Sequence, residues 1–110
     1  MRFGWKSDEV PLKGLYFNLG TIYFRQGQFD KAVQEFQRGI DLNSPALEGT
    51  SAEEWQHEMV SETAQLHVAK AEALLKLNRK QEAIAEYRQA ATMGGPAKQK
   101  AEKELADLGQ

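Results

Sequence analysis

The chain has 110 residues, a net charge of −2 and no cysteine. This length suits a single domain. The lack of cysteine excludes disulfide frameworks and thiolate metal sites and favours a reducing compartment. Acidic and basic residues are interspersed, so the basic footprint of a nucleic-acid-binding protein is missing. No apolar run approaches the roughly 20 residues that cross a membrane. Provided that Met1 is the native start, we expect a cytoplasmic protein without a signal peptide.

The first ten residues contain two large aromatic side chains, Phe3 and Trp5, and show no helical periodicity. Leaving both rings in water would expose a sizeable apolar area, at about 25 cal/mol per Å². We therefore expect this leading segment to dock on the folded protein rather than to fray.

Two helices joined by a tight turn are predicted next. Pro11 suits the first turn of a helix, and Gly27 ends its pattern. The second helix ends before Pro45, which disfavours a helical conformation at the preceding residue. The two helices form an αα-hairpin. Its apolar positions are Leu12, Leu15, Tyr16, Leu19, Ile22 and Tyr23, followed by Phe29, Ala32, Val33, Phe36, Ile40 and Leu42.

A long third helix is predicted from Ala52 to Leu77. Ser51 and Glu54 have the spacing of a capping box at its start, and no proline or glycine follows until Gly94. A break near Ser61 is the alternative. One side of this helix carries Trp55, Met59, Leu66, Ala69, Ala73 and Leu77.

Two shorter helices follow. Asn78 can end the third helix because asparagine tolerates the left-handed backbone conformation, and Gly94-Gly95-Pro96 stops the fourth. The last helix, from Ala97 to Leu108, is apolar on one side and suits the end of a stack. The sequence thus predicts an all-α fold of five helices and no strand. The fourth helix carries Ala83, Ile84, Tyr87, Ala90, Ala91 and Met93.

The two hairpins resemble each other. Gly27 precedes Ala32 by five residues, as Asn78 precedes Ala83, and an aromatic residue follows each alanine four positions later. The first hairpin resembles the tetratricopeptide repeat. Its matching residues are Tyr16, Leu19-Gly20, Tyr23, Ala32 and Phe36.

The second hairpin matches the repeat pattern less well. His67, Lys70-Ala71 and Leu74 stand at the large or apolar positions of its first helix, whereas its second helix fits. Ala32 and Ala83 lie 51 positions apart, about 17 more than the roughly 34 residues of one repeat, so the third helix should extend beyond the repeat body. The expected single domain comprises a leading segment (1–10), repeat one (13–46), an insert with a helix extension (47–63), repeat two (64–97) and a capping helix (98–110).

Small residues mark the crossing of the first two helices. Gly20 and Ala32 let the two backbones approach, and the rings of Tyr23 and Phe36 fill the space around them. Gly39 stands where the family usually has alanine, at a cost of about 1 kcal/mol in helix propensity. This cost indicates close approach by a neighbouring helix.

The resemblance implies a concave groove, lined by the first helices of the repeats, that binds an extended peptide or a partner helix. Phe17 and Phe24 lie seven residues apart, on a stripe distinct from that of Leu19 and Tyr23, so packing does not obviously require them. The alternative is that the apolar groove residues only pack against each other or the last helix. The implied partner-binding residues are Phe17, Thr21, Phe24, Arg25, Gln65, Val68, Glu72, Leu75 and Lys76, with Gln99 and Glu102 able to close the groove.

An apolar groove with charged edges predicts that hydrophobic anchors on the protein or peptide partner dominate binding. The family's clamp for acidic chaperone C-termini needs lysine and asparagine where Phe17 and Thr21 stand, and a third repeat. We therefore expect no binding of such peptides.

Trp55 and Met59 form a possible second interface on the extension of the third helix. Trp55 can be covered by the leading segment, by a partner or by a second copy of the chain, or it can stay exposed. Self-association through this helix, giving a homodimer, is the alternative function.

The sequence contains no recognisable catalytic motif. His57-Glu58 begins the zinc-protease motif H-E-x-x-H, but Ser61 occupies the position of its second histidine. His67 follows His57 by ten residues and points elsewhere at about 100° per residue. We expect a non-enzymatic scaffold without metal or cofactor.

Overall fold

The computed structural model describes residues 13–42, 49 and 51–110. Within these ranges the chain forms five α-helices and no strand, which confirms the all-α fold and the elongated third helix. The docking expected of the leading segment falls outside the described residues. The helices are α1 (Lys13–Arg25), α2 (Phe29–Asp41), α3 (Ala52–Lys76), α4 (Lys80–Ala91) and α5 (Gly95–Asp107).

The helix ends follow the local signals of the sequence. The Ser51 hydroxyl accepts a hydrogen bond from the Glu54 amide (3.1 Å), and the Glu54 carboxylate accepts one from the Ser51 amide (3.4 Å), so the predicted capping box is present. Gly27 (φ 78°) and Asn78 (φ 60°) adopt the left-handed conformation after α1 and α3. No break occurs near Ser61, since α3 continues for 25 residues.

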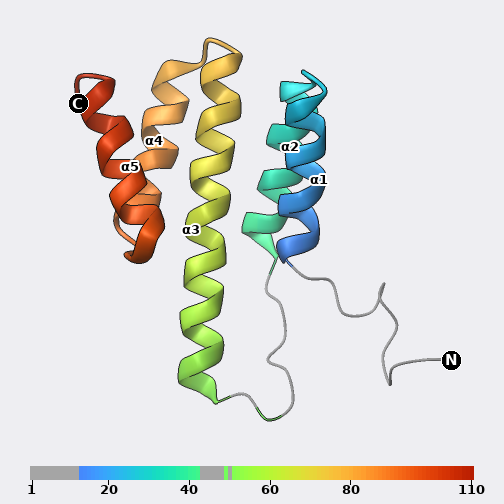
Figure 1. Cartoon of the computed structure of the whole chain (residues 1–110), viewed down its shortest axis with the longest axis vertical. Coiled ribbons are helices and arrows are strands. Elements are labelled where there is room, and N and C mark those ends of the chain that lie inside the picture. Colours follow the sequence, from blue (N-terminus) through green and yellow to red (C-terminus); the bar gives the residue numbers. More distant parts are fainter. Residues whose placement is uncertain (1–12, 43–48, 50) are drawn as a thin grey trace, which may run out of the picture.

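The long helix α3 lies at the centre of the molecule (Figure 1). The α1–α2 hairpin packs on one side of α3, and α4 followed by α5 packs on the other. In the described part, α1 contacts α3 and α3 contacts α5, whereas α2 and α4 do not contact each other. The stack therefore bends so that α1, α3 and α5 lie on its inner side.

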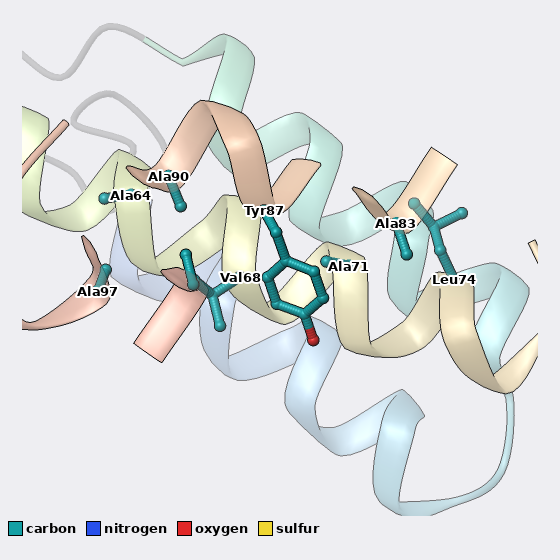
Figure 2. Close-up of a cluster of buried hydrophobic side chains, with 9 residues drawn as sticks. Ala64, Val68, Ala71, Leu74, Ala83, Tyr87, Ala90 and Ala97 are labelled. Carbon is teal, nitrogen blue, oxygen red and sulfur yellow. The ribbon is translucent and has the colours of Figure 1, made fainter. Parts of the chain in front are cut away.

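Two clusters of buried side chains occupy opposite sides of α3. The α1–α2–α3 core contains Phe36 and Leu66 among small alanines, with Phe17 and Phe24 packed against it. The α3–α4–α5 core is built around Tyr87, which lies among alanine, valine and leucine side chains in Figure 2. The small residues allow the helices to approach closely, and the large rings fill the space that remains.

Two glycines mark close approaches between helices, as the sequence predicted. A Cβ atom added at Gly20 would overlap the ring of Phe36, and one added at Gly39 would lie 2.9 Å from the Leu66 side chain. Gly39 therefore lets α3 approach α2, which explains why a residue of poor helix propensity is found there.

Two apolar residues predicted to pack in α1 do not do so. Leu15 and Ile22 are each 51% exposed, because they lie on the side of α1 that faces away from α2 and α3. The helical period of the apolar residues predicted an apolar face for α1 that includes Leu15 and Ile22. The face that α2 and α3 cover is a different one, centred on Gly20.

The first three turns of α3 project beyond the other helices (Figure 1), and α3 contains no buried residue before Ala64. Projection of α3 is the expected result of an insert between the repeats. None of the described helices is long and apolar enough to cross a membrane.

Gly20→Ala should lower the free energy of unfolding by about 1–3 kcal/mol, because the new methyl group overpacks the contact with Phe36. Gly14→Ala, in the same helix, is the matched control. The nearest atom to a Cβ there is 3.9 Å away, so this variant should gain up to about 1 kcal/mol from helix propensity. Urea unfolding followed by circular dichroism measures both, and a change of the same sign in both variants would contradict the packing argument.

Tyr87 is completely buried, and its hydroxyl has no hydrogen-bond partner among the described residues. Burial raises the pKa of Tyr87 far above its ordinary value, and the charges of Glu72 and Glu104 raise it further. Above pH of about 10 the unfolded chain therefore loses this proton while the folded chain keeps it. Stability should fall as the pH rises through that range.

Tyr87→Phe should raise the free energy of unfolding by roughly 1 kcal/mol at neutral pH, because it removes a buried polar group without a partner. The gain should grow above pH of about 10, where only the wild type loses stability through this group. Urea titrations at neutral and alkaline pH test both statements. Tyr23→Phe, at a partly buried position, is the control, and a Tyr87→Phe protein less stable than wild type would show that the hydroxyl has a partner.

Candidate partner-binding groove

A hollow opens on the inner side of the stack, where α1, α3 and α5 face each other. Its volume is about 260 Å³. We call it the groove hollow, and its walls come from both hairpins and the last helix. The lining residues are Phe17, Gln65, Val68, Ala69, Glu72, Pro96, Ala97 and Lys100.

The groove hollow combines apolar walls with a polar rim. Phe17, Val68 and Pro96 contribute apolar surface, and Gln65 is an exposed polar residue. At the rim, Lys100 Nζ lies 3.1 Å from Glu72 Oε2, and both side chains are roughly half exposed. The volume is slightly below the range of about 300–1,000 Å³ typical of small-molecule pockets, so it suits one or two protein side chains.

Four of the nine implied partner-binding residues line the groove hollow, namely Phe17, Gln65, Val68 and Glu72. The other five do not. Phe24 packs edge-on against Phe29, with ring centroids 5.1 Å apart. Leu75 packs against the α3–α4–α5 core.

The polar members of these five residues occupy different environments. The Thr21 hydroxyl donates to the Phe17 carbonyl oxygen within α1 (2.8 Å). Arg25 and Lys76 are exposed in the last turns of α1 and α3. Both helices point the same way in Figure 1, so these two cations lie toward the same end of the groove.

Packing uses Phe17 and Phe24, although their spacing in the sequence did not make this obvious. Both rings pack against the α1–α2–α3 core, and the Phe17 and Phe36 ring centroids are 6.0 Å apart. Phe17 therefore has two roles, since one part of its ring supports α2 and another part lines the hollow.

The last helix contributes different residues from those implied by the repeat positions. Gln99 and Glu102 are exposed and do not line the groove hollow, whereas Pro96, Ala97 and Lys100 do. The tight turn at Gly94 and Gly95 brings the first turn of α5 close to α3. The spacing of Ala97 and Ala101, which are both buried, was the sequence signal for this orientation of α5.

A smaller hollow of about 110 Å³ adjoins the groove hollow, since Phe17 and Gln65 line both. We call it the flanking hollow. Its walls are more polar and come from the start of α1 and the middle of α3. The lining residues are Lys13, Gly14, Phe17, Asn18, Glu62, Gln65 and Leu66.

Lys13 is buried beside the flanking hollow at the end of α2. Its Nζ donates to the carbonyl oxygens of Gly39 (2.7 Å) and Ile40 (3.2 Å), and the Gly39 oxygen also accepts from the Leu42 amide (3.3 Å). The ammonium therefore adds positive charge and hydrogen bonds at the C-terminal end of α2. Burial lowers the pKa of Lys13, an effect that the charges of Glu62 and Asp41 oppose. Lys13 is only 2% exposed.

Glu62 stands on the opposite wall of the flanking hollow. Burial raises the pKa of Glu62, and the negative charge of Glu58 one turn earlier raises it further, while Lys13 opposes both effects. Burial and the Glu58 charge thus outweigh the effect of Lys13, which favours the ionised carboxylate.

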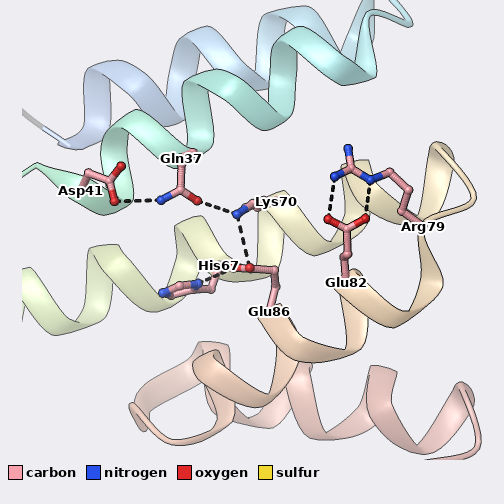
Figure 3. A network of polar contacts seen from close by, with 7 residues as sticks. All are labelled: Gln37, Asp41, His67, Lys70, Arg79, Glu82 and Glu86. Atoms are coloured by element: carbon pink, nitrogen blue, oxygen red, sulfur yellow. Dashed lines mark hydrogen bonds and ion pairs between the residues drawn. The ribbon is translucent and has the colours of Figure 1, made fainter.

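A polar network connects α2, α3 and α4 away from the groove (Figure 3). Lys70 Nζ donates to Gln37 Oε1 (2.5 Å) and to Glu86 Oε2 (3.3 Å). His67 Nδ1 lies 2.6 Å from Glu86 Oε1, and it donates because an ionised carboxylate only accepts. Burial alone would raise the pKa of Glu86, but these two partners hold it below its ordinary value. His67 and Lys70 thus have a structural role, at the two positions where the second repeat departs from the family pattern.

A third hollow, of about 370 Å³, lies between α2, α4 and the end of α3. Its cations already have carboxylate partners. Lys70 pairs with Glu86, Arg79 with Glu82 and Arg38 with Glu35. The positive charges of these three residues are therefore already balanced by carboxylates of the protein.

The possible second interface lies on the projecting part of α3. Trp55 and Met59 are partly buried there, and Val60 is 38% exposed. His57 is exposed on the same segment, far along α3 from His67.

The tetratricopeptide repeat family model matches residues 17–98, which is most of the chain. The chain therefore belongs to the tetratricopeptide repeat family. Comparison with curated proteins and with solved structures gave no significant match. Tetratricopeptide repeats are typically non-enzymatic modules that bind protein partners, so the chain is, in general terms, a scaffold for protein–protein interaction.

Glu86→Gln should lower the free energy of unfolding by about 1–2 kcal/mol at neutral pH, because it weakens the hydrogen bonds to His67 and Lys70. Because the pKa of Glu86 is lowered in the folded protein, its ionised carboxylate stabilises the fold at pH values above the ordinary pKa of glutamate. This contribution is lost as the pH falls. The difference between wild type and variant should therefore shrink below pH of about 4. Chemical unfolding at several pH values tests this. Glu82→Gln, at an exposed pair, should change stability much less, because exposed ion pairs contribute little. An equal loss in both variants would contradict a special role for the network.

Proposed function

We propose that the groove binds a segment of a partner protein, an extended peptide or a helix, by enclosing one apolar side chain in the groove hollow. The observation that carries this proposal is a cavity of about 260 Å³ with mainly apolar walls, contributed by α1, α3 and α5. Such a site spans both hairpins and the last helix.

The chemistry of the walls supports an apolar anchor. Binding energy in protein interfaces concentrates in a few side chains that fill desolvated pockets, and Val68, Ala69 and Ala97 offer such a surface. Gln65 and the Glu72–Lys100 pair can hydrogen-bond to the backbone on either side of the anchor. Removing the anchor should therefore cost more affinity than removing any single rim contact.

The remaining implied residues would act only on a longer partner segment. Arg25 and Lys76 would contact a segment that extends toward the last turns of α1 and α3. Thr21, Phe24 and Leu75 would contribute by shaping the groove between that end and the groove hollow.

Gln65→Trp should abolish peptide binding, because Gln65 is exposed and lines both hollows, so a large ring there would block them. The measurement is selection of random peptides displayed on phage against immobilised wild type and variant. Sequences with an apolar anchor should be enriched on wild type only. Gln81→Trp, which puts the same ring at an exposed site on α4, should enrich the same sequences as wild type. Failure to enrich any peptide on the wild type would refute the proposed function.

Self-association through the projecting part of α3 is the second candidate. Val60 is exposed there, beside Met59 and Trp55, and a second copy could cover these side chains. It ranks second because Glu53, Glu54 and Glu58 crowd the same segment, and a symmetric pairing would bring like charges together.

Trp55→Ala separates the two candidates. If the projecting helix mediates self-association, wild type should form dimers at high concentration, and Trp55→Ala should weaken dimerisation at least tenfold, in line with a central aromatic contact of about 1.4 kcal/mol or more. Sedimentation equilibrium provides the measurement. Gln56→Ala is the control, since Gln56 is an exposed neighbour. A wild type that stays monomeric throughout would remove this candidate.

A further inference from the structure

We propose that the partner segment carries a lysine or arginine next to its apolar anchor, and that Glu62 in the flanking hollow binds this basic side chain. The inference rests on the proposed function, because it assigns the chemistry of a second position on the same partner. It follows from the position and the charges of the flanking hollow.

The two hollows form neighbouring subsites. They share Phe17 and Gln65, and Glu62 lies one helical turn before Gln65 on α3. One turn is about 5.4 Å, which an extended partner spans in about two residues at roughly 3.3 Å each. A side chain that enters the flanking hollow is thus one to three residues from the anchor.

The walls of the flanking hollow suit a cation. The Glu62 carboxylate and the side-chain carbonyl oxygens of Asn18 and Gln65 can all accept hydrogen bonds. A lysine ammonium or arginine guanidinium supplies several donors and no acceptor. The volume of about 110 Å³ has room for such a polar head group but not for a large aromatic ring.

Lys13, the described cation that acts on Glu62, already has other partners. Lys13 Nζ donates to the carbonyl oxygens of Gly39 and Ile40. Among the described residues, Glu58 and Lys13 act on Glu62, and Glu62 and Asp41 act on Lys13. Within this set carboxylates outnumber ammonium groups, and a cation from a partner would relieve the imbalance.

The same excess disfavours acidic partners. At the groove hollow the Glu72 charge is compensated by Lys100, whereas Glu58 and Glu62 would repel an acidic flank. The flanking hollow thus makes the groove selective for apolar segments with a basic neighbour, whereas the groove hollow alone would accept any apolar anchor.

The experiment uses the peptides enriched on the wild type and not on Gln65→Trp. These sequences should contain Lys or Arg within one to three positions of the apolar anchor. Fluorescence polarisation with a synthetic enriched peptide and its Lys→Gln or Arg→Gln analogue then measures affinity. Glu62→Gln should weaken binding of the basic peptide about fivefold, as expected for a partly exposed ion pair, and should leave binding of the analogue nearly unchanged.

Glu53→Gln is the matched control, because Glu53 lies on the same helix outside both hollows, and it should bind both peptides like the wild type. If Glu62→Gln disturbs the fold, the salt dependence of peptide binding to the wild type provides a second measurement. Raising the salt from about 0.01 M to about 1 M shortens the Debye length from roughly 30 to 3 Å. The basic peptide should then lose clearly more affinity than its uncharged analogue.

Four outcomes would overturn the inference. Enriched peptides without a basic preference, or an equal effect of Glu62→Gln on both peptides, would overturn it while leaving the proposed function intact. A wild-type dimer that Gln65→Trp dissociates would show that a second copy occupies the groove. Failure to enrich any peptide would refute the proposed function and the inference together.

Discussion

The close packing of small residues on α3 determines the arrangement of all five helices. Ala69 and Ala73 face the α1–α2 hairpin, while Ala64 and Ala71 face α4 and α5. A short side chain brings neighbouring helices together, and larger rings from the partners fill the remaining space. The α1–α2 hairpin and the α4–α5 pair flank α3, and residues of α1, α3 and α5 together line the groove hollow. The candidate groove is therefore a consequence of how the core is packed.

The helices and the packing of the first hairpin could be predicted because their signals are local. Gly27, Asn78 and the Ser51–Glu54 capping box end or start helices through their own backbone chemistry. Gly20 likewise predicted a close contact from its size alone. The exposure of Leu15 and Ile22 could not be predicted in this way, since an apolar period shows that a face is apolar but not which neighbour covers it.

The candidate groove was only partly predictable. Transfer by repeat position identified Phe17, Gln65, Val68 and Glu72, because these depend on the direction of α1 and α3 alone. The contribution of α5 depends on the tight turn at Gly94 and Gly95, which sets where its first turn meets α3. The core role of Phe17 and Phe24 was missed for a related reason, since one ring can serve two neighbours when three helices converge on it. The flanking hollow depends on where Lys13 places its ammonium, which periodicity does not show.

The polar network explains how the second repeat tolerates its departures from the family pattern. His67 and Lys70 would be poor choices in an apolar contact, yet each is paired with Glu86. A satisfied polar network fixes the relative position of helices more narrowly than interchangeable apolar contacts do. Variation at these two positions therefore requires a matching carboxylate on α4, the other helix of the same hairpin.

Lys13 has a consequence for where the folded unit begins. It lies in the first turn of α1, and its ammonium donates to two carbonyl groups near the end of α2. Among the described residues, a charged side chain thus links the start of α1 to the end of α2. A shortened chain that began after this lysine would keep its repeat signature, which starts at Tyr16, but would remove the ammonium from both carbonyl oxygens and leave the Gly39 oxygen only the Leu42 amide. The smallest stable unit is thus longer at its N-terminal end than the repeat motif alone indicates.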